Sequence, residues 1–260
     1  MIQAQAPSLS YAACGLFRTD EPWIHPSRVE STYEIICVSE GAVCLREGER
    51  VYHLGPGDLV ILLPGVRHEG CEGSRGRTGF YWVHFSAPSL EAFGVAERVT
   101  PAFPNLAIFR QLLHVANTPE YPAYAPAALI TVLLAEIAAI QAQMALQDCQ
   151  VARDAAEYIR INARRRLTAG AVARQYGYSG EHLTRLFRRA YGTGLKAYIC
   201  EARMKAAREL MAHSPFTVKE VAQMLDFDDE NQFIQFFKYH QHQTPTKFRN
   251  ALYNTHLNNR

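Results

Sequence analysis

The sequence predicts a two-domain α+β protein, with a β-rich N-terminal half and an all-α C-terminal half. Residues 30–86 consist of short strand-like runs separated by Gly and Pro, whereas the chain after Pro101 shows helical periodicity. The charge changes as well. Residues 1–149 hold 9 Arg and 15 Asp and Glu, a net charge of −6, whereas residues 150–260 hold 18 Lys and Arg and 10 Asp and Glu, a net charge of +8. A basic half of this kind is a weak indication of binding to nucleic acid or an anionic surface.

The N-terminal half contains short β-rich runs at regular spacing. The expected strands are Tyr33–Val38, Ala42–Arg46, Arg50–Leu54, Leu59–Leu63 and Gly79–Phe85. Short strands divided by turn residues are typical of a sandwich or a small barrel.

Two helices are expected to follow the strands, over residues 106–116 and 125–147. The apolar face of the second is wider than one barrel needs, so we expect it to pair two subunits; the alternative is that it packs only on its own barrel. The basic bias begins at residues 148–153, which places the domain boundary there. The predicted domains are residues 1–150 and 151–260.

Composition and termini point to the cytoplasm. We expect no apolar run of the roughly 18 residues that a membrane helix needs, and residues 1–7 lack the pattern of a secretion signal. The cysteines form no C-x-x-C pair and no disulfide-framework spacing, which favours a reducing compartment and disfavours a structural zinc site. They are Cys14, Cys37, Cys44, Cys71, Cys149 and Cys200.

A helix-turn-helix unit is predicted near residue 177. Thr168 is a plausible N-cap for a short helix over residues 169–176, and Gly177 supplies the positive φ of a tight turn. Ser179 can cap a second helix over residues 180–190. That helix turns Leu183, Leu186 and Phe187 inward and leaves a basic outer face, which completes the helix-turn-helix pattern.

A second unit follows the same plan. Thr217 can cap a helix over residues 218–225, residues 226–228 form the turn, and residues 229–239 form the second helix. The inward residues of this second helix are Phe233, Phe236 and Phe237.

The two units read as copies of one supersecondary element. We expect a constant spacing of 49 residues, which relates Ala173 to Ala222 and Tyr178 to Phe227. A long helix over residues 195–211 is expected to hold the copies apart.

Residues 151–253 resemble the tandem helix-turn-helix DNA-binding domain of the AraC/XylS regulators. The second unit carries the resemblance through Val221-Ala222, Phe227, Phe233, Phe236-Phe237-Lys238, Thr244-Pro245 and Phe248-Arg249. The first unit matches through Ala173, Gly177, Ser179, Leu183, Phe187, Gly192, Tyr198, Arg203 and Ala206. Asp226 and His242 stand where the family has glycines, and Asp tolerates the left-handed region better than most residues.

The resemblance implies that two recognition helices enter consecutive major-groove segments of double-stranded DNA. By position on these helices, the expected base-reading residues are Glu181, His182, Arg185, Glu230, Asn231 and Gln235. The expected phosphate contacts are Arg188, Arg189, Lys238, Lys247 and Arg249. The alternative for each of these residues is that it lies on the solvated surface and does not contact DNA.

The stretch Gly57 to His68 resembles the second motif of cupin barrels, and Glu34 resembles part of the first. Arg28 and Glu30 occupy the positions of the His-x-His pair of metal-binding cupins, so only Glu34 and His68 remain of four usual ligands. Two ligands do not hold a catalytic metal site, so we expect no metal and no cofactor. His25 is nearby in sequence but off-register. A turn position at the barrel mouth is the alternative for His68.

The same resemblance implies a barrel that binds a small effector, most simply a sugar, in a transcription activator that acts as a homodimer with RNA polymerase as a possible partner. The expected pocket residues are Glu34, His68, Trp82 and His84. An N-terminal arm over residues 7–23 is expected to close over the pocket. Three alternatives stay open: a metal-dependent cupin enzyme, a regulator that responds to a lipid, and one that responds to a protein.

Overall fold

The computed structural model describes residues 7–213 and 215–257. Residues 1–6, which carry most of the expectation about secretion, lie outside the described residues. The chain divides into two compact units, residues 1–144 and 145–260.

The N-terminal unit is built from two antiparallel sheets. The five-stranded sheet consists, in spatial order, of β1 (Ser10–Thr19), β8 (Thr78–Ser86), β3 (Tyr33–Glu40), β6 (Leu59–Leu62) and β9 (Val99–Thr100). The four-stranded sheet consists of β2 (Arg28–Val29), β7 (Arg67–Glu72), β4 (Val43–Glu47) and β5 (Arg50–Leu54). The α+β prediction is confirmed, and each of the five predicted strands is present. Four strands were missed, namely β1, β2, β7 and β9.

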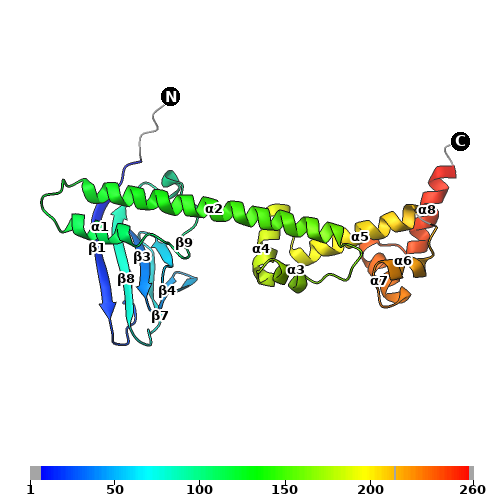
Figure 1. The fold of residues 1–260 in the computed structure, drawn as a ribbon, viewed down its shortest axis with the longest axis horizontal. Helices are drawn as coiled ribbons and strands as arrows, with labels where there is room; N and C mark the ends of the chain where they lie inside the picture. The colour runs from blue at the N-terminus through cyan, green and yellow to red at the C-terminus, as the bar shows by residue number, and fades with distance from the viewer. Residues whose placement is uncertain (1–6, 214, 258–260) are drawn as a thin grey trace, which may run out of the picture. The chain divides into compact units, whose positions relative to one another are not determined.

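The centre of the five-stranded sheet is buried on both faces. Ile36 and Val38 of β3 join the core shared with the four-stranded sheet, whereas Ile35 and Cys37 join the core shared with helices α1 (Ala107–Ala116) and α2 (Ala125–Ile161). Figure 1 shows these helices beside the strands β1 and β8. Because side chains alternate along a strand, β3 places Glu34 on the same face as Ile36, toward the second sheet.

Helix α2 is longer than predicted. It runs for 37 residues through the expected end at residue 147 and through the expected boundary at residues 148–153. Pro126 stands near its start, and no Gly or Pro follows until after Ile161, so nothing in the backbone ends the helix earlier.

Helix α2 also contains an 18-residue window that is apolar enough, by length and composition alone, to cross a membrane. The expectation that no such run exists is therefore wrong, since residues 125–147 hold a single charged residue, Glu136. Of that window 28% is buried within the structure, and Ile130, Leu133 and Ile137 pack against the five-stranded sheet.

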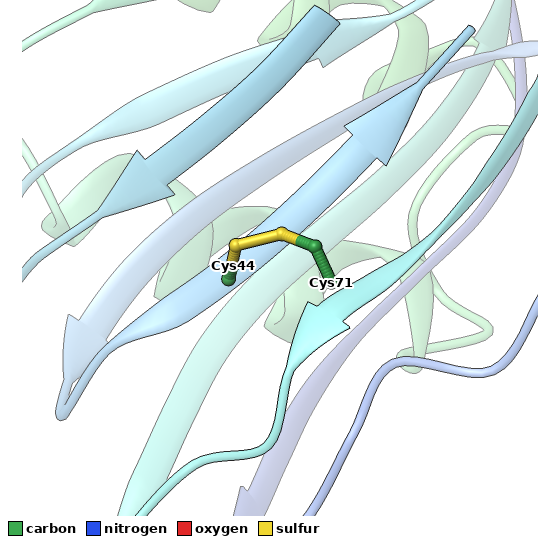
Figure 2. Close-up of a disulfide and its surroundings, with 2 residues drawn as sticks. All are labelled: Cys44 and Cys71. Carbon is green, nitrogen blue, oxygen red and sulfur yellow. A yellow bond between two sulfur atoms is a disulfide. The ribbon is translucent and has the colours of Figure 1, made fainter. Parts of the chain in front are cut away.

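Cys44 on β4 and Cys71 on β7 form a disulfide, as Figure 2 shows. The expectation from cysteine spacing included no such pair. The two residues are 27 positions apart, but β4 and β7 are neighbours in the four-stranded sheet and bring their Cα atoms to 5.4 Å. Cross-strand proximity of this kind leaves no signature in the spacing.

The C-terminal unit is helical. Beyond the last part of α2 it contains α3 (Ala169–Gln175), α4 (Gly180–Tyr191), α5 (Leu195–His213), α6 (Val218–Met224), α7 (Glu230–Gln241) and α8 (Pro245–Leu257). Two cores hold it together. One gathers α2, α3 and α4 around Phe187, and the other gathers α6, α7 and α8 around Phe237. Helix α5 contributes Leu195 and Ile199 to the first core and Met204 and Leu210 to the second.

The predicted constant spacing of 49 residues is wrong for half of each unit. It relates α3 to α6, but the start of α4 at Gly180 corresponds to the start of α7 at Glu230, a spacing of 50. The second turn is one residue longer than the first, which shifts every residue correspondence on the second helix by one.

Candidate nucleic-acid interface and effector pocket

Each helix-turn-helix unit is fixed by side-chain caps. The Oγ of Ser179 accepts from the His182 amide at 3.1 Å, and the Oδ1 of Asp229 accepts from the Gln232 amide at 2.7 Å. Thr168 caps α3, and Thr217 forms a capping box with Glu220 at the start of α6. The predicted caps Thr168, Ser179 and Thr217 are confirmed. Each satisfies an amide that would otherwise be unpaired at a helix start.

Asp226 takes the left-handed conformation that Gly177 takes in the first unit, with φ of 57° against 74°. Its neighbours offset the cost of a side chain in that region. The Oδ2 of Asp226 accepts from the Arg166 amide at 3.0 Å, and Arg203 Nη2 donates to the carbonyl of Leu225 at 2.5 Å. The Arg203 guanidinium also lies 3.9 Å from the centroid of the Phe227 ring. The second turn therefore keeps its shape without glycine.

His242 ends α7 in the left-handed region, with φ of 58°, as Gly192 ends α4 with φ of 71°. An L-residue there costs about 1–2 kcal/mol, whereas glycine adds only about 0.5–1 kcal/mol of unfolded-chain entropy. We expect His242→Gly to raise the free energy of unfolding of the C-terminal unit by about 0.5–1 kcal/mol, measured by urea denaturation. The matched variant Gly192→Ala should lower it by a similar amount. A neutral or destabilising His242→Gly would contradict this explanation.

The second helix of each unit buries an apolar face and exposes a polar face. Helix α4 buries Leu183, Leu186 and Phe187, and its exposed predicted contacts are Glu181, Arg185, Arg188 and Arg189. Helix α7 buries Phe233 and Phe237, and its exposed predicted contacts are Asn231, Gln235 and Lys238. Glu230 is half-buried at the start of α7.

The spacing of 50 residues changes how the two faces correspond. Gln232, not Asn231, takes the place of His182, because each donates its amide to the capping residue. Tyr239, which is 78% exposed, takes the place of Arg189. Neither Gln232 nor Tyr239 was among the predicted DNA contacts, and counting from the capping residues Ser179 and Asp229 is what relates them to His182 and Arg189.

Asp148 of α2 engages two of the predicted DNA contacts. Its Oδ2 lies 3.0 Å from Arg189 Nη2, and its Oδ1 lies 3.8 Å from His182 Nε2. His182 is also stacked on Tyr178, at 4.7 Å between ring centroids, and its Nδ1 lies 3.3 Å from Arg185 Nη2. His182 is thus held between α2 and its own helix, while Arg185 stays exposed.

The two remaining predicted phosphate contacts, Lys247 and Arg249, differ in solvent exposure. Lys247 is exposed in the first turn of α8. Arg249 is partly buried, and its Nε donates to the carbonyl of Met211 at 3.3 Å, so its guanidinium ties α8 to α5.

The N-terminal unit contains a cavity of about 490 Å³. Strands β3 and β8 pair Glu34 with His84, which places both side chains and that of Trp82 on the face toward the second sheet. Three of the four predicted pocket residues, Glu34, Trp82 and His84, line the cavity. The fourth, His68 on β7, is 1% exposed and contacts Glu34 instead of lining the cavity.

Glu34 is a buried carboxylate among histidines. Its Oε2 lies 3.3 Å from His68 Nε2 and its Oε1 lies 3.6 Å from His84 Nε2, while His84 Nδ1 lies 2.9 Å from the hydroxyl of Thr32. Burial alone would raise the pKa of Glu34, but interactions with His68, His84 and His25 outweigh it and lower that pKa. The cavity therefore presents a carboxylate at neutral pH.

His25 also lines the cavity, although it is off-register with the cupin motif. Residues between β1 and β2 carry it to the cavity wall, with its ring centroid 5.3 Å from that of His68. The cluster therefore consists of His25, Glu34, His68 and His84. It adds His25 and His84 to the two candidate metal ligands, Glu34 and His68, that the cupin motifs predict. In the described part of the chain, the donor atoms of these four residues do not all come within 4.8 Å of one another, the spacing that would suit a single metal ion.

Burial lowers the pKa of His25 below its usual 6.5. The unfolded state then binds more protons than the folded state as the pH falls through that value, so stability is lost on acidification. We expect the melting temperature to fall between about pH 7 and about pH 5, and His25→Gln to remove part of this fall. Thermal unfolding at both values tests this, with the exposed His114→Gln as control. An unchanged fall in His25→Gln would contradict the assignment.

The predicted N-terminal arm is a strand, so that prediction is corrected. Residues 10–19 form β1, which pairs with β8 along its length, and Gly15 leaves no room for a side chain beside the Trp82 ring. Phe17 of this strand and Trp23 after it still line the cavity. Their rings pack against Phe80 and form an aromatic wall of the cavity.

Comparisons with known proteins agree with both halves of this description. Residues 10–133 match the family described as "AraC-like ligand binding domain", and residues 172–251 match "Helix-turn-helix domain". The chain is 22% identical to the uncharacterized HTH-type transcriptional regulator YisR of Bacillus subtilis, over 94% of this chain and 93% of YisR. It is 39% identical to the regulator GlxA of Rhizobium meliloti, over 33% of this chain and 26% of GlxA. The solved C-terminal domain of the response regulator AraT from Geobacillus stearothermophilus is similar at 24% identity and a TM-score of 0.37, covering 39% of this chain and 84% of that one.

A ligand-binding β domain followed by two helix-turn-helix units defines a DNA-binding transcription regulator. The chain belongs to the AraC family of such regulators. The relatives are regulators and not enzymes, so the alternative of a metal-dependent cupin enzyme is set aside.

Proposed function

We propose that this regulator reads a two-part DNA site through α4 and α7 and responds to a small polar effector bound beside Glu34. The observation that carries the DNA-reading part is the pair of capped second helices, each with its polar face exposed. Arg185 on α4 and Asn231, Gln232 and Gln235 on α7 are the base readers by this proposal. Glu181 stays a predicted base contact, and the half-buried Glu230 is the weakest of the set.

The phosphate contacts are proposed on charge and exposure. Arg188, Lys238 and Lys247 are exposed cations of the two units and of α8. Such contacts set affinity and register and make binding depend on salt. Arg249 is given a structural role in this proposal, because Met211 already accepts from its guanidinium.

Asp148 is proposed to restrain the first recognition helix. Asp148 pairs with Arg189 and lies close to His182. By this proposal, neither side chain contacts DNA until its interaction with Asp148 is broken. We expect Asp148→Asn to tighten DNA binding and to raise the salt slope by about one unit, because one more cation reaches a phosphate. Fluorescence anisotropy over a salt series measures both.

The control is Glu157→Gln, which removes one negative charge from the same helix at a residue paired with Arg160. Equal tightening in the two variants would show an effect of net charge alone and would contradict a specific restraint by Asp148.

The effector is proposed to be a sugar-like molecule. The cavity of about 490 Å³ has a size typical of small-molecule sites. The carboxylate of Glu34 accepts hydrogen bonds from hydroxyl groups, and the aromatic wall offers a face for stacking. A fatty acid is the second candidate, but its carboxylate would repel the ionised Glu34 at close range.

A thermal-shift series tests the effector class. Neutral sugars should raise the melting temperature of wild-type protein by mass action and leave Glu34→Gln unaffected. Fatty acids and small acids serve as the competing ligands. Stabilisation by a fatty acid alone, retained in Glu34→Gln, would overturn the sugar proposal.

We propose that the active form is a cytoplasmic homodimer that activates transcription by contacting RNA polymerase. Val132 and Met144 leave apolar surface exposed on α2, at 50% and 37% exposure, which supports pairing through that helix. Sedimentation of wild type and Val132→Glu tests the pairing: a monomeric wild type would overturn it. Transcription in vitro from a promoter carrying the selected site distinguishes activation from repression.

A further inference from the structure

The outer face of the four-stranded sheet gathers three metal-binding side chains from three strands. Cys44 on the central strand β4 lies directly opposite His53 on β5 and Glu72 on β7. Opposite residues of antiparallel strands point to the same face. Their neighbours Leu45 and Tyr52 belong to the barrel core, so these three side chains lie on the other face, where His53 and Glu72 are exposed.

The donor atoms of these three residues lie within 4.8 Å of one another. Cys71 adds a fourth donor. The ladder between β4 and β7 shifts register at Cys44, which leaves Cys71 as the extra residue beside it, and Figure 2 shows the two side chains meeting. The disulfide therefore ties up two sulfur atoms at the centre of a set that also holds an imidazole and a carboxylate.

We propose that, once the disulfide is reduced, Cys44, Cys71, His53 and Glu72 bind one zinc-like divalent cation. Two thiolates, one imidazole nitrogen and one carboxylate oxygen are the donor types that tetrahedral zinc takes in proteins. Spacing along the chain disfavoured a structural zinc site because the donors come from three strands and follow no C-x-x-C pattern. The sheet, not the sequence spacing, brings them together.

The disulfide and the bound ion exclude each other. A dithiol reductant breaks the S–S bond by supplying two electrons and two protons. Cys44 and Cys71 become thiols, and the reductant is itself oxidised to a disulfide. The cation then binds two thiolates, and two protons pass to solvent. The exposed imidazole of His53 and carboxylate of Glu72 complete the set of four donors.

Cobalt(II) titration of the full-length chain tests the site. Protein reduced by a phosphine, stripped with a chelator and kept anaerobic should bind one equivalent of Co(II), with the thiolate-to-metal charge-transfer absorption of a sulfur-ligated ion. Zn(II) should displace it. The same protein in its disulfide form should show no charge-transfer band.

Variants assign the donors. Cys44→Ser and Cys71→Ser should abolish the band, and His53→Ala should weaken Co(II) binding by more than about tenfold. Cys149→Ser, which removes an exposed cysteine outside the site, should change nothing. Far-UV circular dichroism and DNA binding of each variant check that it folds, and the exposed His53 keeps the test valid if a cysteine variant fails to fold.

Two results would overturn the proposal. Reduced wild-type protein that shows no charge-transfer band on addition of Co(II) has no thiolate site. A band that survives Cys44→Ser and His53→Ala arises from other thiols.

Discussion

Phe237→Ala is expected to lower the free energy of unfolding of the C-terminal unit by about 3–5 kcal/mol and to abolish DNA binding at 37 °C. Phe237 is fully buried, and its ring packs against those of Phe233 and Phe248, at 5.7 and 5.4 Å between centroids. Truncation leaves a cavity where α6, α7 and α8 meet, and a loss of this size is a large part of the stability of a small domain. Urea denaturation followed by circular dichroism measures it.

Tyr239→Ala is the matched control for Phe237→Ala. Tyr239 lies on the same helix but is 78% exposed, so its truncation should change the free energy of unfolding by less than about 0.5 kcal/mol. Equal losses in the two variants would contradict the assignment of Phe237 to the core and of Tyr239 to the outer face.

Arg185→Ala should relax base preference at one position of the DNA site, a loss of about 1–3 kcal/mol of discrimination or about 5- to 150-fold in relative affinity. Arg185 is exposed on α4 and contacts His182 Nδ1 at 3.3 Å rather than Asp148, so we expect its guanidinium to reach a base edge. Affinities for the selected site and for single-base variants of it, measured at one salt concentration, give the discrimination directly.

Lys238→Ala separates base reading from phosphate contact. Lys238 is exposed in the last turn of α7, and its loss should weaken binding to all sequences alike and reduce the salt slope by about one unit. If Arg185→Ala behaved in the same way as Lys238→Ala, with every sequence weakened and the preferred bases unchanged, Arg185 would be a phosphate contact.

The helical half was the more predictable from sequence, because its signals are local. A cap needs one side chain a few residues from the amide it satisfies, so Thr168, Ser179 and Thr217 were identified from adjacent residues alone. The one-residue slip on α7 arose from treating Asp229 as the first residue of the helix, whereas it is the capping residue that sets the count.

The β half was less predictable because its features depend on pairing between distant segments. Strand β1 exists through its ladder with β8, and His25 reaches Glu34 only because the two sheets face each other. The disulfide needed the register of β4 and β7. None of these pairings can be read from one segment alone.

The end of α2 was missed for a different reason. The charge balance changes near residue 150, and that change was taken as a domain boundary. Charge on solvated faces does not end a helix, whereas Gly and Pro do, and the chain has neither between Pro126 and Ile161.

Selection of bound duplexes from a random pool tests the central claim that both second helices read DNA. We expect wild-type protein to enrich two blocks of specified base pairs whose centres lie one helical turn, about 10–10.5 base pairs, apart. Arg185→Ala should degrade one block and Gln235→Ala the other. Enrichment of a single block, or degradation of the same block by both variants, would contradict the claim that two units share the reading.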